Sequence, residues 1–277
     1  MEKIIEIVGQ TDGPTSIILV GIHGDETCGP IALSEVLPTL KIERGRVLFG
    51  YGNPKAIKAR VRYFETNLNR MFKPEKTLSA RELNSYEYNR AKFLKKYLDQ
   101  ADALLDIHSS SNPNSQSFII CEENAKDIYK YLPFDLVVSG FDAIEPGGTD
   151  YYMNKQGKIG ICIECGNSND PKAISLAEES IQKFLKAREH ISGELKEYPQ
   201  NLINIYRLYF TKTNNFKLAK NFADFESVSQ GQYIGIDGKQ PIQVDKDGVI
   251  LFAQSKESIG EEVFLLGEKI NGKSDLS

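Results

Sequence analysis

Short apolar runs alternate with amphipathic segments over residues 1 to about 195. A continuous apolar run of this length predicts a buried strand, whereas apolar residues three and four positions apart predict a helix. The runs lie at 17–22, 47–51, 103–107, 117–121, 136–139 and 159–164. The helical segments lie at 28–37, at 80–100 and from Pro171 onward, where Asp170 offers a cap. Alternating strands and helices predict an α/β fold with a mostly parallel or mixed sheet flanked by helices.

The pattern changes near Glu197, after which no long helical period occurs. From Ile205 onward the apolar runs are short and broken by turns, with strands expected at 248–253 and 263–266. Asp237–Gly238 and Asp247–Gly248 are typical of hairpin turns. We therefore predict one domain over residues 1–197 and a small β-rich domain over residues 198–277.

Composition narrows the class of protein. Its 277 residues are 40% hydrophobic, which is enough for a substantial core. The net charge of −4, from 34 basic and 38 acidic residues, disfavours a nucleic-acid partner, which needs a clustered positive excess. No stretch approaches the roughly 20 apolar residues of a membrane span, and the first residues lack a secretion signal. We expect a cytoplasmic protein with no membrane partner, and the sequence leaves the oligomeric state open.

Two of the three histidines follow predicted strands. His23 and Glu26 come just after the run at 17–20, and His108 comes just after the run at 103–107. Ligands gather at the carboxyl ends of strands in open α/β sheets. Two imidazoles and one carboxylate, with a fourth position open, are the ligand set of a catalytic zinc ion. We favour one Zn²⁺ per chain over ordinary polar turns, although cobalt, nickel or iron also suits these ligands.

Glu164 alternates with isoleucines in a strand that is otherwise apolar on both faces. An acid there is either a structural ion-pair partner or the general base that takes a proton from water. Cys162 and Cys165 have the spacing of a metal-binding or redox pair, but residues three apart on a strand face opposite sides, which favours structural thiols. His190, late in the last helix, is predicted to be a surface or helix-end residue.

A basic stretch at residues 62–70 carries Arg62, Asn69 and Arg70. The arginine fork matches a carboxylate through two hydrogen bonds, so a pocket with this pair would hold a small anionic substrate. The alternative interpretation is a solvated basic loop.

Four short motifs, taken together, are similar to a known family. In order and approximate spacing they resemble the succinylglutamate desuccinylase/aspartoacylase family, whose members are relatives of the zinc carboxypeptidases. The resemblance covers most of residues 17–170. The motifs are His23-Gly-Asp-Glu26, Asn67-Leu-Asn69-Arg70, Asp106-Ile-His108 and Ile163-Glu164.

The resemblance implies a zinc carboxypeptidase-like fold with catalysis in residues 1–197. It implies that His23, Glu26 and His108 are the zinc ligands and that Glu164 is the general base and proton shuttle. The reaction would be hydrolysis of the amide of an N-acyl amino acid, which yields a carboxylate and an amino acid.

The resemblance also implies roles for the basic stretch. Arg62 would polarise the scissile carbonyl and bind substrate, and Asn69 with Arg70 would hold the substrate's α-carboxylate. Aspartoacylase itself has an arginine shortly before the catalytic glutamate, where it grips an acidic side chain. The corresponding stretch, 147–156, has no arginine, and Lys155 and Lys158 are the basic residues nearest to that place. This departure disfavours N-acetylaspartate as the substrate.

Two other functions remain open. A carboxypeptidase-like metallopeptidase would use the same zinc ligands, the same glutamate and the same arginines on a larger leaving group. A non-catalytic binding module with a retained metal site is disfavoured, because such a module needs neither Glu164 as a base nor Arg62 as a charge stabiliser.

Overall fold

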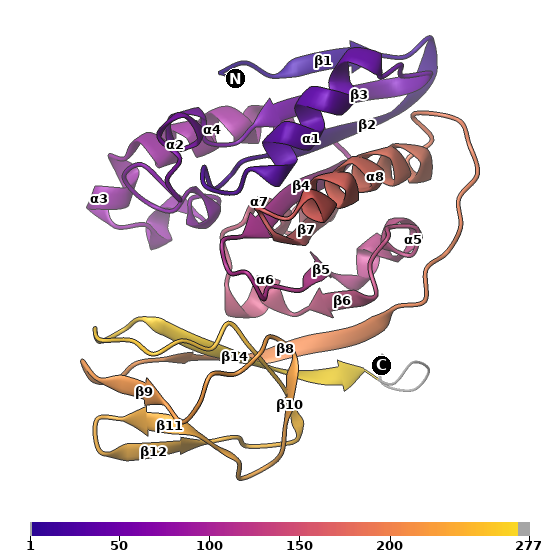
Figure 1. Ribbon diagram of the computed structural model, residues 1–277. Coiled ribbons are helices and arrows are strands. Elements are labelled where there is room, and N and C mark those ends of the chain that lie inside the picture. The colour runs from indigo at the N-terminus through magenta and orange to yellow at the C-terminus, as the bar shows by residue number, and fades with distance from the viewer. Residues whose placement is uncertain (1, 271–277) are drawn as a thin grey trace. The chain divides into compact units, whose positions relative to one another are not determined.

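The computed structural model describes residues 2–270, which divide into two compact units (Figure 1). Unit 1 comprises residues 2–137 and 145–200, and unit 2 comprises residues 138–144 and 201–270. The last seven residues of the domain predicted over 198–277 lie outside the described residues.

Unit 1 is built on a mixed sheet with the strand order β1-β3-β2-β4-β7-β5-β6. Strands β3, β2, β4 and β7 run parallel to one another, while β1 and β5 pair antiparallel with their neighbours. The bounds are β1 Ile5–Val8, β2 Thr11–Val20, β3 Arg44–Tyr51, β4 Ala103–Ser110, β5 Ser117–Cys121, β6 Leu136–Ser139 and β7 Ile159–Asn167. The predicted α/β fold with a mostly parallel or mixed sheet is confirmed.

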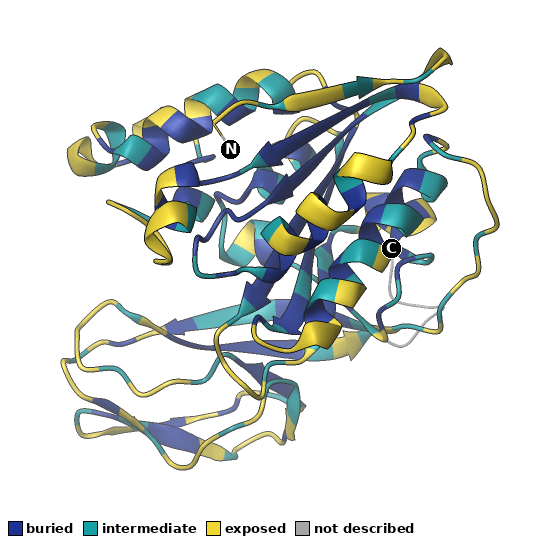
Figure 2. Cartoon of the chain, turned by 45° about the horizontal axis from the view of Figure 1, so that its top comes forward, coloured by how far each residue is buried: buried dark blue, intermediate teal, exposed yellow. Residues whose placement is uncertain are grey.

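Helices cover both faces of this sheet, whose central strands are buried (Figure 2). Helices α1 (Cys28–Val36) and α8 (Pro171–Ala187) pack side by side on one face (Figure 1). Helices α4 (Tyr86–Leu98) and α7 (Thr149–Asn154) bury Leu94 and Met153 against Leu19 and Leu104 of the other face. Successive strand residues alternate between faces, so the apolar runs at 17–20 and 103–107 supply both layers of core.

The remaining helices of unit 1 are short. No helix among residues 2–270 has the length and apolar character needed to cross a membrane. The α-helices are α2 Pro54–Ala59, α3 Ala80–Leu83 and α5 Lys126–Tyr129, and the 3₁₀-helices are η1 Leu37–Thr39, η2 Leu68–Arg70, η3 Glu75–Thr77 and η4 Glu123–Ala125.

The helix predicted at 80–100 is present but divided, because the segment forms two helices, α3 and α4. The Ser79 side chain and Glu82 form a capping box at the start of α3. Ser85 then caps α4 by accepting the backbone N–H of Tyr88 at 3.1 Å. A second capping serine, six residues after the first, therefore starts a new helix rather than continuing the old one.

Two strand ends also differ from the prediction. Strand β4 continues to Ser110, so His108 lies within the strand rather than just past it. Strand β7 likewise continues beyond Glu164 to Asn167. His108 and Glu164 are compatible with a strand because the backbone pairing of β4 with β7 continues beyond them to Ser110 and Asn167. His23, by contrast, follows the end of β2 at Val20, as predicted.

Unit 2 contains two antiparallel sheets, with strand orders β8-β14-β13-β10 and β12-β11-β9. Their core includes a stacked pair, Tyr209 and Phe264, with ring centroids 5.1 Å apart. The elements are α6 Phe141–Ile144, β8 Asn201–Phe210, β9 Phe216–Leu218, β10 Glu226–Val228, β11 Tyr233–Asp237, β12 Gln240–Gln243, β13 Gly248–Leu251 and β14 Glu262–Ile270.

Of the two hairpin turns predicted in this unit, the first is confirmed. Gly238 joins β11 to its antiparallel neighbour β12, and its φ of 62° suits glycine at a tight turn. The hairpin predicted at Asp247–Gly248 is wrong, because β12 and β13 belong to different sheets. The turn at Asp247–Gly248 therefore connects a strand of one sheet to a strand of the other, and its two flanking strands do not pair.

Candidate active site

Three predicted metal ligands meet at the carboxyl ends of β2 and β4. Glu26 Oε1 lies 2.7 Å from His23 Nδ1, and Glu26 Oε2 lies 2.9 Å from His108 Nδ1. One ligand atom from each residue lies within 4.8 Å of the other two, and all three residues are buried. Strands β2 and β4 are parallel neighbours, so their carboxyl ends lie at the same edge of the sheet.

Two glycines shape the loop that carries His23 and Glu26. Gly21 has a φ of 66°, a left-handed conformation that turns the chain at the end of β2. A Cβ on Gly24 would lie 2.0 Å from the carbonyl carbon of Ala56, so only glycine allows the loop to pass against α2. Asn53, the N-cap of α2, donates its backbone N–H to the Gly21 carbonyl oxygen at 2.9 Å. The loop is thus held from both sides.

The charges of this cluster suit a cation. Burial raises the pKa of Glu26, but His23 and His108 outweigh burial and leave the pKa well below its usual value. For His108, burial lowers the pKa, yet Cys162, Asp106 and Glu26 together raise it well above its usual value. Two imidazole nitrogens and a carboxylate oxygen that converge in a buried place fit a zinc ion, which would displace the His108 proton.

The other ring nitrogen of each histidine lies near a side-chain oxygen, at hydrogen-bond geometry for His23 and at ion-pair distance alone for His108. Asn67 Oδ1 lies 3.0 Å from His23 Nε2, and Asp106 Oδ2 lies 3.3 Å from His108 Nε2. Asp106 also accepts a hydrogen bond from the Thr149 hydroxyl of α7. Such partners orient a metal-binding imidazole and fix its tautomer, leaving Nδ1 directed at Glu26. Neither Asn67 nor Thr149 is among the predicted site residues, although Asn67 opens one of the four motifs.

Glu164 lies beside His108 on the neighbouring strand. The β4–β7 register pairs His108 with Glu164, and paired residues of adjacent strands face the same side. Burial, and next the negative charge of Glu26, raise the pKa of Glu164 to about 8, against the opposing effects of His108 and Arg62. A carboxyl group with such a pKa gains and loses its proton near neutral pH.

Arg62 reaches the cluster from the loop after α2. Its Nη1 lies 3.2 Å from Glu26 Oε1, while 53% of its side chain is exposed. The Arg62 guanidinium group therefore contacts the cluster while about half of the side chain stays exposed to solvent. This arrangement suits contact with a bound substrate and is more specific than a solvated basic loop.

A buried glutamate anchors the same loop. Glu87 is fully buried at the start of α4, and its Oε1 accepts the Phe64 backbone N–H at 2.7 Å. Its Oε2 accepts the backbone N–H groups of Glu65 and Thr66, each at 3.2 Å. Asn53 Nδ2 donates to Oε1 at 3.1 Å. Glu87 thereby fixes the backbone between Arg62 and the other residues of the basic stretch.

Asn69 and Arg70 follow in the 3₁₀-helix η2, which Asn67 caps. The Asn69 backbone N–H donates to Asn67 Oδ1 at 3.0 Å, so one side chain positions both His23 and this turn. Arg70 Nη2 donates to Glu145 Oε1 at 2.9 Å. The predicted carboxylate-binding arginine thus contacts a carboxylate of the chain itself.

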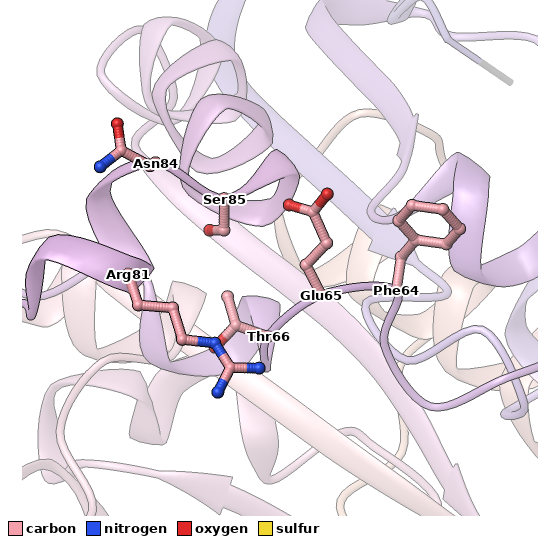
Figure 3. A pocket seen from close by; sticks show the side chains of 6 residues that line it. All are labelled: Phe64, Glu65, Thr66, Arg81, Asn84 and Ser85. Atoms are coloured by element: carbon pink, nitrogen blue, oxygen red, sulfur yellow. The ribbon is translucent and has the colours of Figure 1, made fainter.

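A pocket lies beside this loop, at the junction of α3 and α4 (Figure 3). None of its residues is a predicted site residue, so the pocket does not coincide with the His–Glu–His cluster. Its lining residues are Phe64, Glu65, Thr66, Arg81, Asn84 and Ser85.

His190 lies apart from the cluster and is fully buried, so its prediction as a surface residue is wrong. It does follow α8, as the helix-end alternative stated. Its Nδ1 lies 2.9 Å from the Arg44 carbonyl oxygen, and its Nε2 lies 2.8 Å from Ser16 Oγ. These contacts tie the end of α8 to the sheet. The four cysteines are buried free thiols, which agrees with a structural role.

Comparison with known proteins identifies the class. Residues 12–195 match the model of the succinylglutamate desuccinylase/aspartoacylase catalytic domain. The chain therefore belongs to the succinylglutamate desuccinylase/aspartoacylase family, a family of deacylases of N-acyl amino acids. The resemblance stated from the motifs is confirmed.

Individual relatives agree with this membership. The chain is 26% identical to the succinylglutamate desuccinylase of Shewanella baltica, over 92% of this chain and 83% of that protein. A succinylglutamate desuccinylase structure from Vibrio cholerae superposes with a TM-score of 0.82 at 19% identity, covering 98% of this chain and 87% of that one. The ectoine utilization protein EutE (DoeB) of Ruegeria pomeroyi, in a product-bound structure, gives 0.71 at 19% identity, covering 96% and 88%. At such identities the structures show a shared fold.

Proposed function

We propose that this protein is a zinc-dependent amidohydrolase that cleaves the acyl amide of an N-acyl amino acid or a similar small carboxylate. The observation that carries the proposal is the buried His23–Glu26–His108 cluster with Glu164 beside it on the next strand. His23, Glu26 and His108 would hold one zinc ion per chain. When bound, zinc supplies Lewis acidity, which lowers the pKa of water and polarises a carbonyl.

Glu164 is the general base in this proposal. Its carboxylate takes a proton from the attacking water and then passes it to the nitrogen of the leaving amine. Its place beside His108 supports this role, because both side chains face the same side of the sheet. Arg62, whose Nη1 already reaches Glu26, stabilises the negative charge that develops on the acyl oxygen.

Asn69 and Arg70 orient the substrate through its α-carboxylate in the same proposal. A fixed carboxylate aligns the scissile carbonyl for attack and removes much of the entropic cost of the reaction. The names of the relatives support a small anionic substrate, since the Shewanella baltica and Vibrio cholerae proteins are called succinylglutamate desuccinylases. The Ruegeria pomeroyi structure holds a product, which is consistent with small-molecule turnover.

The direct test is amine release by the zinc-loaded protein from a panel of substrates. The panel contains N-acetyl, N-succinyl and longer N-acyl amino acids, together with short peptides that have free C-termini. We expect release from at least one N-acyl amino acid, loss of release after chelation, and recovery when zinc is restored. Release from peptides alone would indicate a metallopeptidase, and zinc binding without any release would indicate a binding module.

A further inference from the structure

The pocket at the junction of α3 and α4 contains two opposite charges (Figure 3). Its volume of about 360 Å³ lies within the range of small-molecule sites. Arg81 lines the pocket from α3, and Glu65 lines it from the loop that follows Arg62. The other four lining residues are uncharged, so the lining carries no net charge. A ligand that matches this lining has one positive and one negative group.

These two charges do not pair with each other. Within the described part of the chain, residues 2–270, Arg81 has no hydrogen-bond or ion-pair partner, and Glu65 has no ion-pair partner. Glu65 Oε2 accepts the Tyr86 backbone N–H at 2.5 Å, while Oε1 and the Thr66 hydroxyl have no partner among the same residues. Both charged side chains are exposed, so a ligand can reach them from solvent.

The Phe64 ring supplies an apolar wall to the pocket. Its side chain is 50% exposed, yet its backbone N–H is held by Glu87 Oε1 at 2.7 Å. The ring also meets Tyr86 edge to face, with centroids 6.2 Å apart, and Lys55 Nζ lies 4.9 Å from its centroid. A ring that is held in place and remains half exposed favours contact with an apolar group of a ligand.

We propose that this pocket binds a free α-amino acid with a neutral, apolar side chain. The α-carboxylate binds the Arg81 guanidinium group, whose fork matches it, and the Thr66 hydroxyl. The α-ammonium group binds Glu65 Oε1, and the side chain packs against Phe64. A charged ligand side chain finds no counter-charge, because Arg81 and Glu65 are the only charged residues of the six that line the pocket.

The pocket is distinct from the His–Glu–His cluster but shares a loop with it. Glu87 accepts the backbone N–H groups of Glu65 and Thr66, and the same loop carries Arg62, which reaches Glu26. The proposed reaction releases a free amino acid, whose ammonium group replaces the amide of the substrate. Glu65 therefore selects product over substrate. The assignment of the ligand as a product rests on the proposed function, whereas the binding itself does not.

The test compares three probes: L-leucine, L-leucinamide, which lacks the carboxylate, and N-acetyl-L-leucine, which lacks the ammonium group. Their dissociation constants are measured by calorimetry on the zinc-loaded Glu164→Gln variant, so that no probe is consumed. The measurement is repeated with Arg81→Gln or Glu65→Gln added. We expect each addition to weaken L-leucine binding at least about tenfold, since each removes a charged hydrogen-bond partner. The two other probes should change little.

Two controls separate this site from general effects of charge and of stability. Lys76→Gln removes an exposed positive charge from the neighbouring 3₁₀-helix η3 and should leave L-leucine binding unchanged. Thermal denaturation should show an unchanged midpoint for Arg81→Gln, because Arg81 has no partner among the described residues. In Glu65→Gln the side-chain carbonyl can still accept the Tyr86 N–H.

The outcomes distinguish this inference from the proposed function. No binding of L-leucine, binding that survives Arg81→Gln, an equal loss in Lys76→Gln, or an equal dependence of all three probes on Arg81 overturns the amino-acid site. Hydrolysis in the substrate panel would then leave the proposed function standing. Selective, Arg81-dependent binding of L-leucine without hydrolysis of any amide supports the site and overturns the proposed function instead.

Discussion

The Glu87 carboxylate accepts the backbone N–H of Phe64 at 2.7 Å, which ties helix α4 to the loop that carries Arg62. Replacing it by glutamine would remove the charge from a fully buried acceptor and turn an amide toward backbone donors. We expect Glu87→Gln to lower the free energy of unfolding by about 2–4 kcal/mol, because hydrogen bonds to charged groups are strong. Urea unfolding measures this loss.

The matched control is Glu82→Gln in the exposed capping box of α3, which should cost only about 0.5–2 kcal/mol. In activity assays, Glu87→Gln should lower kcat/KM through misplacement of Arg62, whereas Glu82→Gln should leave it near the parent value. Equal effects of the two substitutions would remove Glu87 as the anchor of the loop.

Glu164→Gln should separate metal binding from turnover. Glutamine keeps the size of the side chain but cannot carry the proton from water to the amine. Removal of a general base typically costs 10²–10⁴-fold in rate, so kcat should fall by about that factor. Zinc content, measured by atomic absorption, should stay at one ion per chain. Full activity in this variant would exclude Glu164 from the mechanism.

Zinc should stabilise the protein through the three clustered residues. A ligand at 1,000 times its dissociation constant stabilises the folded state by about 4 kcal/mol, which raises the thermal midpoint. We expect this rise in the parent protein and in Glu164→Gln, and its loss in His108→Ala. Thermal denaturation with zinc and with chelator measures it. A zinc-dependent rise that survives in His108→Ala would place the metal elsewhere.

Asp106→Asn tests the partner of the metal-binding imidazole. Asp106 Oδ2 lies 3.3 Å from His108 Nε2 and would orient the ring. Loss of such a partner typically weakens metal affinity by about 10–100-fold. Zinc titration against a competing chelator should show this loss. Asp102→Asn, an exposed acid at the other end of the same strand, is the control and should bind zinc like the parent.

His190 makes stability depend on pH. Burial, followed by the charges of Arg188 and Arg44, lowers its folded-state pKa below the ordinary 6.5, despite opposing contributions from the Arg44 backbone and Asp102. Below about pH 6.5, His190 is therefore protonated more readily in the unfolded chain than in the folded chain. Lowering the pH then lowers the free energy of unfolding, by at most about 1.4 kcal/mol per pH unit. Above that pH the contribution is complete.

The measurement compares the parent with His190→Gln between pH 8 and pH 5. The stability advantage of the parent should shrink as the pH falls below about 6.5, since glutamine does not titrate. A constant difference across this range would show that His190 does not titrate on unfolding.

The sequence by itself determined the class of fold and the candidate chemistry. Continuous apolar runs of strand length predict strands that are buried on both faces, because such strands need apolar residues on both sides. Amphipathic helical segments between these runs predict the helices that cover the sheet, so the α/β fold follows from local patterns. Polar residues placed just after such runs, as at His23 and Glu26, identified the edge where ligands gather. The helix caps Ser79 and Asp170 could also be predicted from the sequence, because their hydrogen bonds span only a few residues.

Tertiary structure alone decided the contacts between residues far apart in the chain. The β4–β7 register, not any local pattern, sets His108 beside Glu164. Glu87 and Glu145 gave no signal in the sequence, because neither lies within an apolar strand as Glu164 does and their partners are far away in the chain. The same holds for His190. Its position in the sequence predicts a helix-end residue, and only the fold brings Ser16, 174 positions earlier, into contact with its ring. Hydrogen bonding and burial depend on the neighbours that folding supplies, and these decide which polar residues become a site.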